Sequence, residues 1–331
     1  MNSRASRCLK TSIGCALVAL ALEGCHVKPH EVPSDIEPRA AAAPQKVEAG
    51  AAFAMEYRWQ VGPQAPRIGE SLQAFVHFVD ASGALMFTDD HRPVPPPEAW
   101  QPGQVYSYKR IVLVPGLLPP GPVTVRMGLF SGKGERMALK GETTGRREYK
   151  VGALEVLRKS ARAHLTYEDG WYAPDAPAGD PFTERRWMQK EARASFRTRG
   201  RDVVLIVSAE TTRTFPETPI LTMAIGAIGV HLPVTSPDPF LARIHFKAAS
   251  LGARWSELRL SMSQSFVPKL LNLGDDSREL SLWVHGLVVG EAGELDKALE
   301  DGALEAGPLE GPSKVDVAPV PAPGRSRPSA H

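Results

Sequence analysis

Hydrophobic and polar residues alternate along two long stretches of the chain, and a period of two residues is typical of β-strands with one buried face. In residues 72–79, Leu, Ala, Val and Phe fall on one face and Gln, Phe, His and Val on the other. The turn-forming sequence DASG (80–83) follows, and the apolar run ALMF comes next. This order predicts a β-hairpin.

The hairpin belongs to a longer series of short strands. Further β-branched and apolar runs occupy residues 105–115, 122–131 and 147–157, and Gly- or Pro-containing turns separate them. Six to seven short strands with a turn about every ten residues are typical of a β-sandwich. We therefore expect an immunoglobulin-like sandwich over residues 52–158.

A second series of strands follows the first. Residues 187–196 alternate in polarity, residues 201–210 include a nearly continuous apolar run, and residues 219–234 contain two short runs around a Gly-containing turn. No segment here shows a convincing helical period beyond a short turn at 248–257. We expect a jelly-roll-like sandwich over residues 159–290. The predicted fold class is all-β, with two tandem β-sandwiches and disordered termini.

The N-terminal residues have the pattern of an export signal. Three basic residues precede an apolar run at 11–22, which is too short for a permanent membrane-spanning helix. The run ends in LEGC, and Leu22, Gly24 and Cys25 match the end of a bacterial lipoprotein signal, whereas Glu23 departs from it. We therefore expect a signal peptide over 1–24 and a lipid, such as palmitate, on Cys25. An ordinary signal peptide is the alternative.

The positions of the cysteines favour lipidation. The chain has Cys8, Cys15 and Cys25, and no cysteine follows in the sequence. Stable disulfides are therefore excluded in the processed chain, and a lone exposed thiol in an exported protein would be reactive. The expected location is the bacterial cell envelope. There the lipid anchors the chain to a membrane, and the chain faces the periplasm or the exterior.

Both flanks of the predicted sandwiches differ from them in composition. Residues 25–51 are rich in Pro, Ala and charged side chains and show no hydrophobic period, so we expect a flexible tether. Residues 291–331 are first acidic and rich in Ala and Gly, then rich in Pro. We expect a disordered tail there.

The charge balance argues against nucleic acid as a partner. Removing residues 1–24 takes three of the 39 basic residues and one of the 37 acidic residues, so the remaining charges balance. Binding to phosphate backbones requires a basic surplus or a focused basic patch. The two basic clusters, GRREYK (145–150) and FRTRGRD (196–202), are expected to be solvated strand ends.

The stretch EDGWYAPDAPAGDPFTERRWMQKEA (168–192) is the strongest candidate for a ligand site. Aromatic rings bind the apolar faces of sugar rings, and carboxylates fix the sugar hydroxyls. The stretch supplies both kinds of side chain within one Pro- and Gly-rich loop. The candidate ligand-binding residues are Trp171, Tyr172, Asp175, Asp180 and Glu184.

A structural interpretation of the same stretch stays open. Trp187 begins an alternating strand, so we expect it to point inward and to close one end of the second sandwich. Trp171 would then cover the same core. The loop acids would pair with Arg185 or Arg186 at the rim and contribute little to stability.

Two further clusters suggest metal ligands, without a spacing that is diagnostic of a metal. Asp89, Asp90 and His91, with His77 upstream, are the first cluster; the alternative is that they bond the backbone of the Pro-rich loop that follows. We expect Trp100 to pack beneath that loop. The second cluster is Asp275 and Asp276, for which a turn and a surface Arg–Asp pair are the alternative. No metal or other cofactor is assigned.

The two β segments together resemble tandem β-sandwich domains of bacterial envelope lipoproteins, which also occur attached to glycosyltransferase-like proteins. The motifs that carry the resemblance are FVHFVDASGALMFTDDHRPVPPPEAWQPGQVYSYKRIVLVP (75–115), DGWY (169–172), RRWM (185–188), SFVP (265–268) and DDSRELSLWVH (275–285). The resemblance covers about residues 52–290. It implies two non-catalytic sandwiches, the second of the galactose-binding type.

The motifs of common enzymes are missing from the sequence. It contains neither Gly-x-Ser-x-Gly nor His-Glu-x-x-His, and a mobile loop is a poor platform for a pair of catalytic carboxylates. We expect a non-enzymatic, exported binding or scaffolding module, with glycan as a candidate ligand. The alternative is a structural partner in a protein assembly of the envelope that binds no sugar, which exposure of Trp59 or Phe75 would favour. A glycan-active enzyme is a minor alternative.

Overall fold

The computed structural model describes residues 33–158, 165–175, 182, 185–291, 304–305 and 307–308. The expected signal peptide and Cys25 lie outside these residues. In the described part of the chain, no helix is long and apolar enough to cross a membrane. The structure is all-β with several sheets, so the predicted fold class is confirmed at that level.

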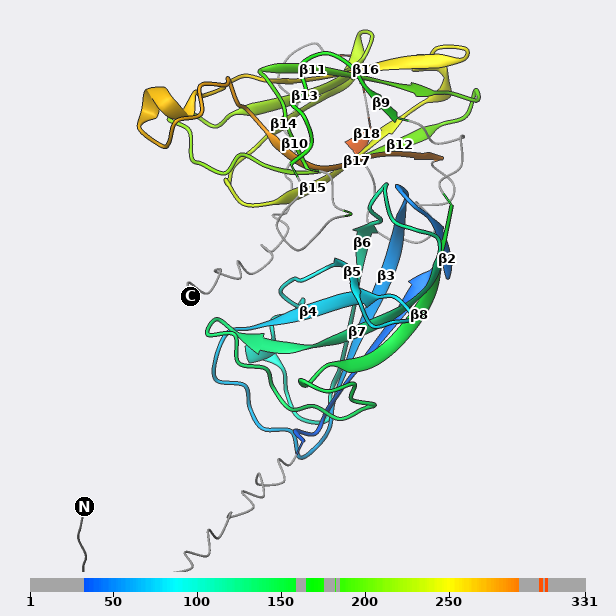
Figure 1. The fold of residues 1–331 in the computed structure, drawn as a ribbon, viewed down its shortest axis with the longest axis vertical. Helices are drawn as coiled ribbons and strands as arrows, with labels where there is room; N and C mark the ends of the chain where they lie inside the picture. Colours follow the sequence, from blue (N-terminus) through cyan, green and yellow to red (C-terminus); the bar gives the residue numbers. More distant parts are fainter. Residues whose placement is uncertain are drawn as a thin grey trace, which may run out of the picture. The chain divides into compact units, whose positions relative to one another are not determined.

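The first sandwich begins with a three-stranded antiparallel sheet (Figure 1). Its strands are β1 (Ile36–Ala43), β3 (Ala52–Val61) and β6 (Val105–Leu113), with β3 in the centre. Inward residues of β3 alternate with exposed ones, as the period of two requires.

The second sheet of this sandwich has five strands in the order β2-β8-β7-β4-β5. These are β2 (Lys46–Glu48), β8 (Tyr149–Leu157), β7 (Gly121–Ser131), β4 (Leu72–Val79) and β5 (Leu85–Thr88). β4 and β5 form the predicted antiparallel hairpin. The Asp80 carboxylate closes its turn by accepting hydrogen bonds from the backbone N–H groups of Ser82 and Ala84.

Large side chains from both sheets form one core. Phe53, Tyr57 and Trp59 of β3 and Phe78 of β4 are fully buried within it. Trp100 is also buried, and its indole N–H donates to the Pro95 carbonyl at 2.9 Å. The predicted packing of this tryptophan beneath the Pro-rich loop is therefore confirmed.

The second sandwich also has two sheets. The first follows the order β10-β17-β12-β15-β18 and consists of β10 (Arg186–Trp187), β17 (Trp283–Glu291), β12 (Val203–Glu210), β15 (Phe240–Phe246) and β18 (Leu304–Glu305). The second follows the order β19-β14-β13-β16-β11-β9 and consists of β19 (Gly307–Pro308), β14 (Ile228–Pro233), β13 (Ile220–Ile225), β16 (Trp255–Met262), β11 (Glu191–Arg197) and β9 (Leu165–Tyr167). Buried side chains of both sheets form a core separate from that of the first sandwich.

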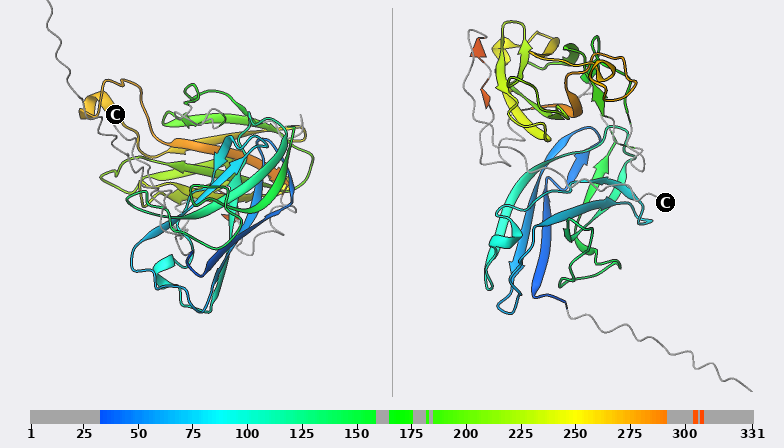
Figure 2. Two further views of the ribbon diagram at one scale, coloured as in Figure 1. Left: turned by 60° about the horizontal axis from the view of Figure 1, so that its bottom comes forward. Right: turned by 90° about the vertical axis from the view of Figure 1, so that its left-hand side faces the viewer.

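Three short 3₁₀ helices connect the strands of the described residues: η1 (Pro97–Ala99), η2 (Ala248–Ser250) and η3 (Pro268–Leu271). η2 lies in the segment where a short turn was expected. η3, drawn in gold, lies at the tip of a loop that projects from the second sandwich (Figure 2).

The expected tether over 25–51 is wrong for residues 36–48. Ile36 is fully buried and β1 pairs with β3 over its whole length, while β2 pairs in parallel with β8. β1 has the sequence IEPRAAAA, in which only Ile36 is strongly hydrophobic. The strand is held by backbone pairing rather than by a row of large apolar side chains, so its pattern resembles that of a linker.

The tail expected over 291–331 also contains paired residues. β18 adds in parallel to β15, and β19 adds antiparallel to β14, so residues 304–305 and 307–308 extend the two sheets of the second sandwich. Glu291, the first residue of the expected tail, belongs to β17. The other residues of the expected tail lie outside the described part of the chain.

Candidate functional site

The stretch 168–192 folds as two paired arms. Bridges join Trp171 to Met188 and Asp175 to Arg185. The Asp175 N–H donates to the Arg185 carbonyl at 2.7 Å, and Tyr172 N–H donates to the Trp187 carbonyl at 3.0 Å. Asp180 and Glu184 lie outside the described residues.

Trp171 supports the core of the second sandwich. Its side chain is half-buried and packs against that core, and its ring meets Tyr167 edge-on at 4.9 Å between ring centroids. The indole N–H donates to the Arg193 carbonyl at 2.6 Å. The structural interpretation therefore fits this tryptophan better than a role in stacking on sugar.

Tyr172 contacts the loop before β17. Its hydroxyl donates to the Glu279 carbonyl at 3.1 Å, and the Arg278 guanidinium lies 4.8 Å from the centre of its ring. Asp276 holds that guanidinium in a two-bond contact at 3.0 and 2.7 Å, and it also accepts from the Arg278 backbone N–H. The hydrogen bonds from Arg278 lower the pKa of the Asp276 carboxyl. This geometry agrees with the turn interpretation of the Asp275–Asp276 pair.

Trp187 does not close the core, and this expectation is wrong. Met188 takes the inward position and is fully buried, whereas Trp187 lies on the outer face of its sheet. Successive residues of a strand point to opposite faces, so a shift of one residue exchanges the two roles. Trp187 pairs across the strands with Trp283, and the two rings stack with centroids 5.8 Å apart and an angle of 12°.

Two phenylalanines extend the stack into an aromatic face, by which we mean Trp187, Phe215, Phe266 and Trp283. Phe266 meets Trp187 edge-on at 6.0 Å, and Phe215 meets Phe266 at the same distance. All four side chains are half-buried. Such a face buries apolar area while it keeps part of each ring in contact with solvent.

Charged groups surround the aromatic face. The guanidinium of Arg213 lies 5.1 Å from the centre of the Phe266 ring, and that of Arg185 lies 5.3 Å from the Trp283 ring. Both distances lie in the range of cation–π contacts. The face therefore combines flat apolar rings with fixed hydrogen-bond donors.

A buried carboxylate lies beside the stack. Glu210 is opposite Trp283 in the sheet and is only 7 % exposed, and its Oε1 lies 3.4 Å from Nε2 of His285. The indole N–H of Trp283 is buried and has no acceptor among the residues that the structure describes. A donor of this kind costs free energy unless an acceptor reaches it.

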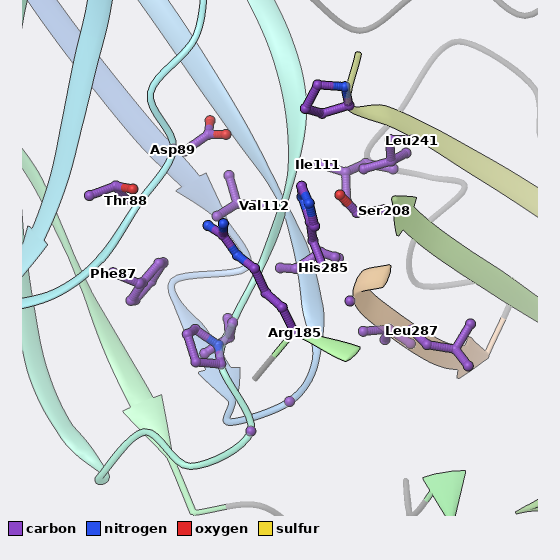
Figure 3. A pocket seen from close by; sticks show the side chains of 18 of the residues that line it. Phe87, Thr88, Asp89, Ile111, Val112, Arg185, Ser208, Leu241, His285 and Leu287 are labelled. Atoms are coloured by element: carbon purple, nitrogen blue, oxygen red, sulfur yellow. The ribbon is translucent and has the colours of Figure 1, made fainter. Parts of the chain in front are cut away.

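A cavity of about 270 Å³ is lined partly by the same sheet. Arg185, Ser208, His285 and Asp89 line it (Figure 3). Arg110 belongs to the same lining. Its lining mixes charged and apolar side chains, as in many small-molecule sites. Two of its charges, Asp89 and Arg110, are already paired with each other.

Asp89 is the centre of a buried polar network in the first sandwich. Its Oδ2 accepts from the Tyr57 hydroxyl at 2.8 Å, and Arg110 donates to both carboxylate oxygens at 3.1 Å. Burial alone would raise the pKa of the Asp89 carboxyl, but the charge of Arg110 and these hydrogen bonds hold the pKa below its usual range. The carboxylate is therefore ionised and saturated with donors.

His91 and Asp90 face different partners. Nδ1 of His91 donates to the Asp89 carbonyl at 2.6 Å, so Nε2 accepts from the Tyr108 hydroxyl at 2.8 Å. Asp90 accepts from the Val76 N–H at 2.9 Å. Burial lowers the pKa of His91 to about 4 and raises that of Asp90 to about 6.

These contacts agree with the structural interpretation of the first acidic cluster. Asp90 and His91 bond the backbone of their own loop and of the neighbouring strand β4, as that interpretation predicts. In the described part of the chain, no three His, Cys, Asp or Glu side chains form a group that could hold a metal ion.

Comparisons with known proteins give no family assignment. No family model matches the chain. No curated protein matches it either.

Solved structures give only distant likenesses. The N-terminal CBM22-1-CBM22-2 tandem domain from Paenibacillus barcinonensis Xyn10C is 11 % identical, with a TM-score of 0.23 over 76 % of this chain and 82 % of that one. The C-terminal domain of the Streptococcus agalactiae AgI/II polypeptide BspA is 11 % identical, with a TM-score of 0.22 over 76 % and 90 %. A partial N-terminal region of the enterococcal surface protein is 8 % identical, with a TM-score of 0.22 over 86 % and 97 %. Likenesses of this size carry no argument about function.

Sequence reasoning missed most of the aromatic face. Trp187 was assigned to the core, and Phe215, Phe266 and Trp283 stand far from it in the sequence. Only the pairing of β10 with β17 brings Trp187 and Trp283 together. The available signal was the motif SLWVH, in which Trp283 stands between two apolar residues that point the other way.

Proposed function

We propose that this chain is an exported, lipid-anchored and non-catalytic protein of the bacterial envelope, and that it binds glycan at the aromatic face of its second sandwich. The observation that carries this proposal is the stack of Trp187 on Trp283, on the outer face of the sheet. It replaces the loop acids as the centre of the candidate site.

The chemistry of the face supports a carbohydrate ligand. Sugar rings have apolar faces that pack on indole rings and hydroxyl groups that need fixed polar partners. Arg213 and the indole N–H of Trp283 are donors, and Glu210 is an acceptor. A polyhydroxylated ligand can accept hydrogen bonds from both donors and donate one to Glu210 while its ring packs on the indoles.

A binding role without catalysis is supported by the contacts of three acids, Asp89, Asp90 and Asp276. The Asp89 carboxylate is saturated by Tyr57 and Arg110, and Asp276 is held by Arg278. Glycoside hydrolysis needs two acids that face each other across a cleft, one of them with a raised pKa. The raised pKa belongs to Asp90, whose Oδ1 accepts from the Val76 backbone N–H.

The sequence supports export and anchoring. The segment before Cys25 has the basic and apolar regions of a lipoprotein signal. The first strand begins at Ile36, which leaves ten residues between Cys25 and the fold. Ten extended residues reach about 35 Å, so the first sandwich would be held close to the membrane.

Co-sedimentation with insoluble envelope polysaccharide tests the glycan site. We expect the full chain to sediment with the polysaccharide, and Trp187→Ala to lose most of this binding because the stack is broken. Trp255→Ala is the matched control, since Trp255 is 48 % exposed on the other sheet of the same sandwich. Equal sedimentation of the three proteins, or none for the wild type, would contradict the proposal.

A protein partner is the second candidate, and the loop around η3 favours it. Leu270, Leu271 and Leu273 are 78 %, 43 % and 62 % exposed. Apolar side chains gathered on an ordered loop are typical of interaction sites. Trp59 and Phe75 do not supply such a surface on the first sandwich, because both are buried. A fixed protein partner that co-purifies from membranes, and is lost in Leu270→Ser, would favour this role.

A further inference from the structure

We propose that the aromatic face binds a glycan of hexuronic acids, and that Arg213 binds the carboxylate of one of its sugars. The proposal deepens the proposed function and rests on it, because the sugar ring would pack on the stacked indoles of Trp187 and Trp283. It names the class of glycan that the face prefers.

Arg213 lies against aromatic rings and not against an acid. Its guanidinium is 5.4 Å from the centre of the Phe215 ring and 5.1 Å from that of Phe266. Its Nε donates to the Thr214 carbonyl at 3.3 Å, whereas Nη1 is buried and has no acceptor among the residues that the structure describes. Glu217, four residues later, is exposed, and no acid of the described residues forms an ion pair with Arg213. The guanidinium therefore lacks a counter-charge within this part of the chain.

Acids from the neighbouring loop have partners of their own. Glu279 accepts from the Ser265 hydroxyl at 2.6 Å, and Asp276 is held by Arg278 at 2.7 Å. Neither carboxylate neutralises Arg213. An external anion can therefore bind there without displacing an ion pair of the described residues.

The turn that holds Arg213 has a strained backbone. Thr212 has a φ angle of 61°, and a β-branched residue adopts this left-handed region only at a cost in free energy. The turn follows directly after Glu210, the last residue of β12. It is fixed by the buried Thr211, whose hydroxyl donates to the Arg213 carbonyl at 2.9 Å. Such strain gathers at ligand sites, where it holds a side chain in place before the ligand arrives.

The two ends of the aromatic face offer different chemistry. Ring contacts run from Trp283 through Trp187 to the two phenylalanines beside Arg213. Glu210 and Arg185 both lie at the Trp283 end, which suits sugar hydroxyls because it offers an acceptor and a donor. The phenylalanine end offers an arginine without an acid, which suits an anion.

A hexuronic acid matches this arrangement. Its carboxylate lies at one edge of the sugar ring and its hydroxyls lie around the rest, so the ring can pack on an indole while the carboxylate reaches Arg213. A planar carboxylate accepts two parallel hydrogen bonds from a guanidinium, and such charge-assisted pairs are stronger than neutral hydrogen bonds. A neutral sugar would leave Arg213 without a counter-charge.

Calorimetric titration of the full chain with tetragalacturonate tests the proposal. The matched ligand is the fully methyl-esterified tetrasaccharide, which keeps the rings and hydroxyls but has no charge. We expect the acid to bind about tenfold more tightly than the ester, because the ester forms no charge-assisted pair. Equal Kd values would overturn the proposal and leave the glycan site standing, whereas binding of neither ligand would overturn both.

Variants of Arg213 identify the cation. We expect Arg213→Gln to bind the acid about tenfold more weakly than the wild type and to bind the ester equally well. Arg213→Lys keeps the charge but loses the planar fork, and we expect it to lose about threefold in affinity for the acid. The control is Arg259→Gln, which removes an exposed charge from β16 on the other sheet of the same sandwich and should keep the full preference. Thermal unfolding shows whether each variant folds.

An undiminished preference for the acid in Arg213→Gln would contradict the proposal. If that variant does not fold, Arg213→Lys decides in the same way. Sulfated maltotetraose separates a carboxylate from negative charge alone, because it carries sulfates and no carboxylate. We expect it to bind more weakly than tetragalacturonate, and equally tight binding that depends on Arg213 would show that the face recognises charge alone and overturn the proposal.

Discussion

At the scale of single residues, Asp90 and His91 are adjacent in the first sandwich, and burial shifts their pKa values in opposite directions. Burial raises the pKa of Asp90 to about 6 from an ordinary 3.8, so the stability that it contributes falls as the pH rises from about 4 to 6. Burial lowers the pKa of His91 to about 4 from an ordinary 6.5, so its contribution falls as the pH drops from 6.5 to 4. The two effects offset each other between pH 4 and 6.

Without the Asp90 carboxyl, the pH dependence of stability should reflect the titration of His91. Asp90→Asn keeps an oxygen that accepts from the Val76 N–H but removes the buried charge. We expect a gain of about 1–3 kcal/mol in the free energy of unfolding at pH 7, which disappears near pH 4. Urea unfolding at several pH values measures this. A variant that is less stable than the wild type at pH 7 would contradict it.

At the scale of elements, β1 is part of the first sandwich rather than a tether. Ile36→Ala removes a fully buried side chain, so we expect the free energy of unfolding to fall by about 2–4 kcal/mol. Ala41→Ser, at an exposed position of the same strand, should change it by less than about 0.5 kcal/mol. If both variants unfold like the wild type in thermal scans, the segment is a tether after all.

The register of β10 makes a second prediction at this scale. Met188 is fully buried in the second core, so Met188→Ala should lower the free energy of unfolding by about 2–4 kcal/mol. Trp187→Phe keeps an aromatic ring on the outer face, and we expect a loss below about 1.5 kcal/mol. Chemical denaturation measures both changes. If Trp187→Phe lowered the free energy of unfolding more than Met188→Ala, Trp187 would be the core residue.

The elements also show how far the sequence predicts this fold. β4, β5 and their DASG turn follow from alternation and turn chemistry, since both are local signals. The sequence does not predict β1, because its alanines form no alternating pattern and the backbone hydrogen bonds that stabilise it come from β3. The sequence does not predict the aromatic face either. Trp187 and Trp283 stand almost a hundred residues apart, and only the pairing of β10 with β17 brings them together.

At the scale of the whole molecule, the proposed function requires attachment to a membrane at one end of the chain and glycan binding by the second sandwich. The attachment is tested by growing cells with labelled palmitate. We expect the wild type to take up the label and Cys25→Ala to lose it, because no other cysteine follows the apolar run. Label that persists in the variant would place the lipid elsewhere.

The most direct test of the central claim follows the indole N–H signals of the chain by nuclear magnetic resonance during titration with soluble envelope oligosaccharide. The chain contains six tryptophans, so each signal can be assigned by substitution. We expect the signals of Trp187 and Trp283 to shift with the ligand, while that of Trp171, which donates to the Arg193 carbonyl, stays in place. A shift of Trp171 alone, or of none of the three, would contradict it.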